Sequence, residues 1–195
     1  MDRDGLMAAL RKESEEGHPE KRMRAFAALL ARESGLGEDG LTVVGGSALE
    51  IYTEGDYISQ DIDLLAEDRE RAESVLRRWG FVRDGMYWVG SPMKEAIQIV
   101  GRYDSGSPSH NTFVMTRYGR LRLGSMEDLI WHRLYEARAP GWKGPPALAE
   151  AKLLSHRYHG QLDWPYILKK ASENGVEDLA LELYHERVGW STTTD

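Results

Sequence analysis

One stretch of the sequence limits the possible fold more than any other, and it runs from Thr42 to Ala66 (TVVGGSALEIYTEGDYISQDIDLLA). It starts in an apolar run, 41–44, that predicts a strand, and this run breaks at Gly45-Gly46. The residues after the glycines suit a short helix, and a second apolar run around Ile62 predicts another strand. We therefore expect a sheet in which two strands are joined through a glycine break and a short helix.

The second of these strands carries two acids, Asp61 and Asp63, on either side of Ile62. Successive side chains of a strand point to opposite faces, so both carboxylates share one face while Ile62 points into the core. Two like charges held side by side cost free energy unless something neutralises them, and a divalent cation is the usual reason to keep such a pair. We expect Asp61 and Asp63 to hold Mg²⁺ or Mn²⁺.

The paired glycines, Gly45 and Gly46, supply the other half of a site. They lack a Cβ, so the backbone can approach a ligand closely, and a helix that starts directly after them offers free N–H groups to an anion. An acidic pair beside such a turn predicts a site for Mg²⁺ and a nucleoside triphosphate such as ATP. In this hypothesis Gly45, Gly46 and Ser47 hold the β- and γ-phosphates.

The order Gly45-Gly46-Ser47 followed by Asp61-Ile62-Asp63 resembles the signature of the polymerase-beta-like nucleotidyltransferase superfamily. Thirteen residues, 48–60, separate the two halves. Within that superfamily the chain more closely resembles small bacterial nucleotidyltransferase-like proteins, several of which belong to toxin–antitoxin or phage-defence systems. The resemblance covers most of residues 41–185 and includes the segments LRRWGF, SMEDLIWHRLYEA and AKLLSHRYHGQLDWPYIL.

The resemblance implies a third carboxylate on a neighbouring strand, which acts as a metal ligand and as the base for an attacking hydroxyl. The matching position in the strand expected at 95–101 (EAIQIVG) is Gln98. Glutamine can supply an oxygen but cannot take up a proton at neutral pH. Glu95 is offset by three residues and should lie on the opposite face, while Asp104 follows the strand and should lie in a loop.

Hydrophobic spacing predicts an α/β (α+β) fold, with a mixed, partly antiparallel sheet flanked by helices and a C-terminal helical bundle. We expect a nucleotidyltransferase-like core with N-terminal helices at 1–124, a helical subdomain at 125–190 and a frayed tail at 191–195, with the ligand between the first two. Lys152 lies in the region from which similar proteins bring a basic residue to the triphosphate. A solvent-facing helix lysine is the alternative.

Composition removes several classes of function. The net charge of −7 argues against a protein that coats DNA or RNA, because neutralising phosphates takes clustered Lys and Arg. The chain has no cysteine, so disulfides and thiolate metal sites are excluded. No run approaches the roughly 20 apolar residues of a membrane span and no signal peptide is evident, so we expect a cytoplasmic protein.

Two functions remain open. The first is a Mg-dependent nucleotidyltransferase that transfers a nucleoside monophosphate from an NTP to a hydroxyl of a protein, a tRNA or a small molecule. The second is a catalytically impaired protein of the same fold that binds a nucleotide or a partner, such as the antitoxin or sensor half of a two-gene system with a cognate partner. Gln98 favours the second, and the intact acids at 61 and 63 favour the first.

Overall fold

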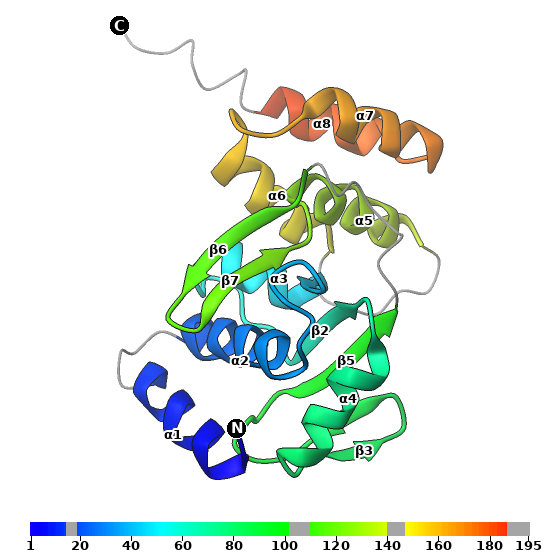
Figure 1. The fold of residues 1–195 in the computed structure, drawn as a ribbon. Helices are drawn as coiled ribbons and strands as arrows, with labels where there is room; N and C mark the ends of the chain where they lie inside the picture. The colour runs from blue at the N-terminus through cyan, green and yellow to red at the C-terminus, as the bar shows by residue number, and fades with distance from the viewer. Residues whose placement is uncertain (15–18, 102–109, 140–146, 187–195) are drawn as a thin grey trace, which may run out of the picture. The chain divides into compact units, whose positions relative to one another are not determined.

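The computed structural model describes residues 1–14, 19–101, 110–139 and 147–186 of the chain. The chain divides into two compact units, Met1–Gly124 and Ser125–Asp195 (Figure 1). The expected tail at 191–195 and the loop acid Asp104 lie outside the described residues.

The first unit is an α/β unit. Its helices are α1 (Arg3–Ser14), α2 (Pro19–Glu33), α3 (Gly45–Tyr52) and α4 (Arg69–Arg78). Its strands are β1 (Leu41–Val44), β2 (Asp61–Ala66), β3 (Val82–Asp84), β4 (Tyr87–Val89), β5 (Ala96–Gly101), β6 (Thr112–Thr116) and β7 (Gly119–Leu123). The fold class predicted from the sequence is confirmed.

The strands described form one sheet in the order β3-β4-β5-β2-β1-β7-β6. β1 pairs antiparallel with β2 and parallel with β7, while β2 pairs parallel with β5. The β3–β4, β4–β5 and β6–β7 pairs are antiparallel. The sheet is therefore mixed, and β1 and β2, the strands on either side of the glycine break, lie at its centre.

One face of the sheet forms the core of this unit. Its centre consists of fully or almost fully buried side chains, namely Val43, Ile62, Leu64, Ile97 and Ile99. Arg77 of α4 lies over the Trp88 ring, with its guanidinium carbon 5.3 Å from the ring centroid. Phe26 of α2 packs against Trp79, which follows α4, at a centroid separation of 5.8 Å. Helices α2 and α4 thus cover the apolar face, and the acids of β2 alternate to the other face.

The end of α4 corrects one predicted boundary. The sequence predicts two short strands, at Gly80-Phe81 and at 85–89, with a turn at Asp84-Gly85. The first of them, β3, starts instead at Val82. Gly80 adopts a φ of 83°, and the Phe81 N–H donates to the Leu76 carbonyl at 3.0 Å. This left-handed glycine ends the helix, so the two residues belong to its C-terminal cap and not to the hairpin.

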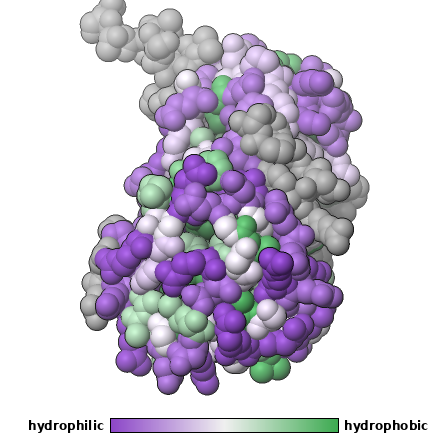
Figure 2. Space-filling view, viewed as in Figure 1, coloured by the Kyte–Doolittle hydropathy of each residue, from purple (hydrophilic) through white to green (hydrophobic). Residues whose placement is uncertain are grey.

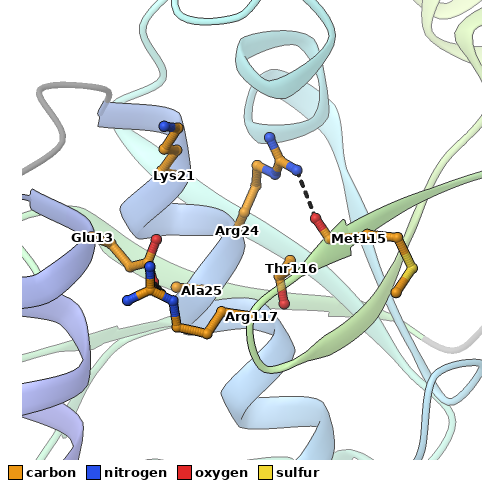
Figure 3. Close-up of a pocket in the computed structure, with 7 residues that line it drawn as sticks. All are labelled: Glu13, Lys21, Arg24, Ala25, Met115, Thr116 and Arg117. Carbon is orange, nitrogen blue, oxygen red and sulfur yellow. Dashed lines mark hydrogen bonds and ion pairs between the residues drawn. The ribbon is translucent and has the colours of Figure 1, made fainter.

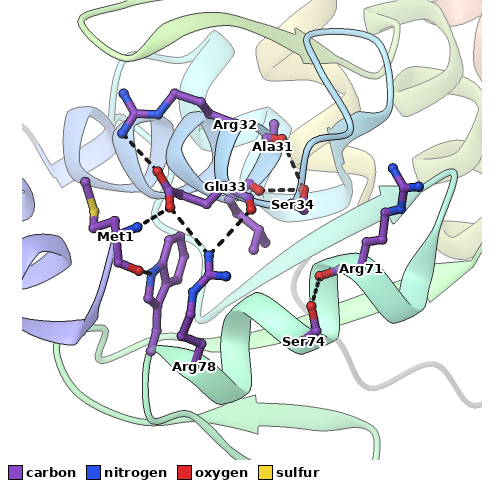
Figure 4. A network of polar contacts seen from close by, with 10 residues as sticks. Met1, Ala31, Arg32, Glu33, Ser34, Arg71, Ser74 and Arg78 are labelled. Atoms are coloured by element: carbon purple, nitrogen blue, oxygen red, sulfur yellow. Dashed lines mark hydrogen bonds and ion pairs between the residues drawn. The ribbon is translucent and has the colours of Figure 1, made fainter.

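A polar network joins the start of α1 to α2 and α4 (Figure 4). The carboxylate of Glu33 accepts from the amino group of Met1 and from Arg78, whose Nη2 lies 3.4 Å away. The indole N–H of Trp79 donates to the Met1 carbonyl at 3.3 Å. The hydrogen bond from the amino group lowers the pKa of Glu33 below its ordinary value, against a smaller opposing effect of burial.

The second unit is helical in its described residues. It consists of α5 (Met126–Arg138), α6 (Ala147–Tyr158), α7 (Trp164–Glu173) and α8 (Glu177–Glu186). The sequence predicts N-caps at Ser125, with Asp128 three residues on, and at Asp163, with Trp164-Pro165 directly after it. Both are confirmed, because Ser125 and Asp163 accept from the backbone N–H groups of Asp128 and Tyr166.

The sequence predicts that Leu179, Leu181 and Leu183 pack on the inner side of the last helix. For Leu181 this prediction is wrong, because the residue is 38% exposed. The buried stripe of that region runs through Val176, Ala180 and Leu183, spaced four and three apart, and Leu181 lies outside it.

Hydrophilic residues cover most of the molecular face shown in Figure 2. Among the described residues, no helix has the length and apolar character needed to cross a bilayer.

Candidate functional site

The two acids of β2 lie on the face opposite the core, as their alternation with Ile62 predicts. In the sheet register, Asp63 is paired with Val44 on one side and with Gln98 on the other. Asp61 is paired with Ala96 of β5. Paired residues of adjacent strands point to the same face, so the structure brings Asp61, Asp63 and Gln98 together.

The glycine bend packs directly against the acidic strand. Gly45 has a φ of 60°, and a Cβ at this position would lie 2.6 Å from Oδ2 of Asp63. A Cβ on Gly46 would lie 2.7 Å from Oγ of Ser59. Side chains cannot be added at either position without moving these groups. The glycine bend therefore lies directly beside the Asp63 carboxylate, as the hypothesis of one site for a metal ion and a triphosphate requires.

Ser47 contributes to this site through its hydroxyl in a way the sequence did not predict. The side chain is fully buried, and its Oγ donates to the Asp61 carbonyl at 2.9 Å and accepts from the Asp63 N–H at 3.0 Å. The hydroxyl thus ties the first turn of α3 to the acidic strand. A contact of Ser47 with a phosphate would have to come from its backbone N–H.

The N-terminus of α3 has no side-chain cap. Its N-cap is Val44, which offers no side-chain acceptor, and no side-chain hydrogen bond caps the helix. The first N–H groups of a helix have no carbonyl partner within the helix and carry the positive end of its dipole. Since these groups follow Gly45 and adjoin the acidic strand, an anion and a cation could bind side by side there.

Gln98 occupies the position where the resemblance implies a third carboxylate. Its amide Nε2 lies 3.3 Å from Sδ of Met86. Glu95 precedes β5, and its carboxylate accepts from the Lys94 N–H at 3.1 Å. In the part of the chain that the structure describes, no three His, Cys, Asp or Glu side chains gather as metal ligands. Two carboxylates nevertheless fit Mg²⁺, which is commonly held by one or two carboxylates together with substrate phosphates.

Two residues that sequence reasoning missed support the acidic strand. Glu50 of α3 is 4% exposed, and its Oε2 accepts from the Ser59 N–H at 2.7 Å. The Ser59 hydroxyl in turn lies 3.4 Å from Oδ1 of Asp61. Burial raises the pKa of Glu50, the Ser59 hydrogen bond opposes that rise, and the charges of Glu95 and Glu20 add to it. The sequence signal that could have pointed to Glu50 is a carboxylate within the mostly apolar run ALEIY.

Lys152 lies on α6 in the second unit. Its Nζ is 2.5 Å from Oε1 of Glu186, and this hydrogen bond is the main cause of the lowered pKa of Glu186. The lysine is therefore in an ion pair, and its predicted contact with a triphosphate stays a prediction.

A separate pocket of about 190 Å³ lies in the first unit, away from the acids of β2. Its lining residues are Glu13, Lys21, Arg24, Ala25, Met115, Thr116 and Arg117 (Figure 3). Arg24 donates to the Met115 carbonyl at 2.9 Å, and Nε of Arg117 lies 3.5 Å from Oε1 of Glu13. These contacts already engage two of its basic side chains, so we assign the pocket no ligand.

Comparison with solved structures gives the fold. The chain matches an antigenic nucleotidyltransferase-like protein from Paracoccidioides brasiliensis over 83% of its own length and 91% of that chain, with a TM-score of 0.55 and 11% identity. The chain has a nucleotidyltransferase-like fold. It also aligns with JHP933 from Helicobacter pylori over 82% of its own length and 88% of that chain, with a TM-score of 0.43 and 13% identity.

No protein-family model matches the chain, and no curated protein is found to be similar to it. At these identities the structural likeness concerns the fold alone, so any statement about the chemistry of the site depends on the residues of this chain. The association with toxin–antitoxin systems stays a prediction.

Proposed function

We propose that the protein is a Mg-dependent nucleotidyltransferase, which transfers a nucleoside monophosphate from an NTP to a hydroxyl of a protein, an RNA or a small molecule. The observation that carries this proposal is the close approach of the Asp63 carboxylate to the glycine bend, where a Cβ on Gly45 would lie 2.6 Å from Oδ2. An anion-binding helix N-terminus and an acidic pair on one face are the two parts that a metal–triphosphate site needs.

Each residue has a defined task in this proposal. The N–H groups at the start of α3 would bind phosphate oxygens, and Asp61 and Asp63 would hold Mg²⁺. When bound, the ion would neutralise the negative charge of the triphosphate. The acceptor oxygen forms a bond to the α-phosphorus as the bond to the bridging oxygen breaks, pyrophosphate leaves, and the acceptor proton passes to water. The amide oxygen of Gln98 would orient the acceptor hydroxyl.

Pyrophosphate release tests the proposal. The purified protein is incubated with Mg²⁺ and each NTP in turn, with candidate acceptors from the three classes, and compared with Asp63→Ala. We expect release that depends on Mg²⁺ and falls by at least about 100-fold in the variant, since charge stabilisation by the metal site is lost. Equal pyrophosphate release by both proteins would show that Asp63 takes no part in the reaction.

A specific observation favours a second function, a nucleotidyltransferase fold that binds nucleotide or a partner without efficient transfer. Gln98 is paired in register with Asp63, and so stands on the acidic face where a proton acceptor would be needed. A Gln98→Glu variant separates the two functions. If the natural protein binds Mg²⁺–NTP without releasing pyrophosphate and the variant releases it, the second function is correct.

A further inference from the structure

The segment between α3 and β2, residues 53–60, carries the chain from the glycine-bend helix into the acidic strand. Its start is fixed locally, because the Thr53 hydroxyl donates to the Leu49 carbonyl at 2.8 Å and accepts from the Tyr57 N–H at 3.2 Å. Its end is fixed by a longer contact, from the Ser59 N–H to Oε2 of Glu50 at 2.7 Å. The segment is therefore held at its start by the side chain of Thr53 and at its end by the side chain of Glu50.

Ser59 lies between the two halves of the site. Its Oγ is 3.4 Å from Oδ1 of Asp61, and it is also the atom that a Cβ on Gly46 would meet at 2.7 Å. The Tyr57 hydroxyl would lie 3.3 Å from the same Cβ. A displacement of Ser59 would consequently change both the orientation of the Asp61 carboxylate and the space beside the glycine bend.

A carboxylate at the position of Glu50 is energetically unfavourable. It is 4% exposed, and the charges of Glu20 and Glu95 act on it unfavourably. Burial of a carboxylate costs free energy that hydrogen bonds offset only in part. An apolar residue would fill the same space in the core of α3 without that cost, but it could not accept the Ser59 N–H.

We propose that Glu50 is a positioning residue of the acidic pair, which acts through Ser59 to hold the Asp61 carboxylate beside the glycine bend. The inference rests on the proposed function, because it assumes that Asp61 and Asp63 hold a divalent cation. Residues that orient metal ligands without touching the metal commonly change metal affinity by about 10- to 100-fold when they are removed.

The experiment measures Mn²⁺ affinity by titration calorimetry, with and without a non-hydrolysable ATP analogue. We expect Glu50→Ala and Ser59→Ala to weaken Mn²⁺ binding by about tenfold or more. Glu50→Gln should stay within about threefold of the natural protein, because its amide oxygen can still accept the Ser59 N–H. Glu73→Ala is the matched control, since Glu73 is 5% exposed on α4 but pairs with Arg69 and Arg77.

Unchanged Mn²⁺ affinity in Glu50→Ala and Ser59→Ala overturns the inference, as does an equal loss in Glu73→Ala. If Glu50→Ala does not fold, the comparison of Ser59→Ala with Glu50→Gln decides the question. If the natural protein binds no Mn²⁺ with or without nucleotide, the proposed function fails. Hydrogen exchange then tests the positioning role by itself. Faster exchange of the amides of Ser59 and of residues 61–63 in Glu50→Ala and Ser59→Ala than in Glu73→Ala supports the role, and unchanged exchange in both variants contradicts it.

Discussion

Gly45 is the residue at which backbone conformation and site chemistry meet. Its φ of 60° lies in the left-handed region, and its missing side chain leaves room for the Asp63 carboxylate. Gly35 offers a direct comparison, because it has a φ of 67° but a Cβ there would meet nothing within 4 Å. The two glycines share the backbone requirement and differ only in what lies beside them.

Gly45→Ala is therefore expected to do more than Gly35→Ala. Both should lose about 1–2 kcal/mol of stability from the left-handed backbone. Only Gly45→Ala should also displace Asp63 and weaken Mg²⁺–nucleotide binding by about tenfold or more. Urea unfolding measures the loss of stability, and calorimetric titration measures the nucleotide affinity of the two variants. Equal nucleotide affinity in both variants would show that the fit between the glycine bend and Asp63 does not matter for binding.

Glu50 and Glu33 should respond to pH with opposite sign. The pKa of Glu50 is raised in the folded protein, so the folded chain binds more protons above pH 4.5 and the contribution of this residue to stability falls as pH rises through that window. The pKa of Glu33 is lowered from 4.5, so its contribution is present at higher pH and is lost as pH falls through the lowered value.

Thermal unfolding from about pH 3 to about pH 8 tests both signs. Relative to the natural protein, Glu50→Gln should become more stable as pH rises, and Glu33→Gln should become less stable. Parallel curves for the two variants would show that burial at Glu50 and the amino-group contact at Glu33 do not govern their titration.

At the scale of elements, local pattern predicted what lay within one strand or one helix. The alternation of Asp61, Ile62 and Asp63 predicted their faces, and Ser125 and Asp163 were read correctly as caps. The contact between Glu50 and Ser59 could not be predicted, because it joins a helix to a later segment across nine positions and leaves no periodic signal. Leu181 was misassigned for a related reason, since several leucines of one short helix compete for one buried stripe.

Ser47 joins α3 to β2, and its replacement tests that connection. Ser47→Ala removes the Oγ that accepts the part-buried Asp63 N–H, so we expect a loss of about 1–3 kcal/mol in the free energy of unfolding. Ser74→Ala is the control, because that hydroxyl is exposed on α4 and bonds only its own helix, to the Arg71 carbonyl at 2.8 Å. Ser74→Ala should change stability by less than about 0.5 kcal/mol.

At the scale of the whole molecule, the first unit contains the glycine bend, both acids and Gln98, while Lys152 belongs to the second. The expectation of a boundary near Ser125 rests on the helix cap that follows the last expected strand. Composition predicted neither the acceptor nor the preferred base, since the identity of a substrate depends on the shape of a surface and not on the average chemistry of the chain.

Lys152→Ala tests whether the second unit takes part in nucleotide binding. If Lys152 contacts the triphosphate, its removal should lower Mg²⁺–ATP affinity by about fivefold to tenfold and leave Mn²⁺ affinity unchanged. Lys170→Ala is the control, because Lys170 also pairs with a glutamate on the second unit, Glu173 at 3.2 Å. Exposed ion pairs contribute little, so neither variant should lose more than about 1 kcal/mol of stability.

The central claim is that Asp61 and Asp63 share a cation with a triphosphate bound at the glycine bend. Anomalous scattering from a crystal soaked with Mn²⁺ and a non-hydrolysable ATP analogue tests it directly. We predict a manganese peak about 2.0–2.3 Å from oxygens of both carboxylates, with the phosphates against the N–H groups of Gly45 to Ser47. Ordered nucleotide elsewhere, or a peak that touches neither carboxylate, would contradict the account.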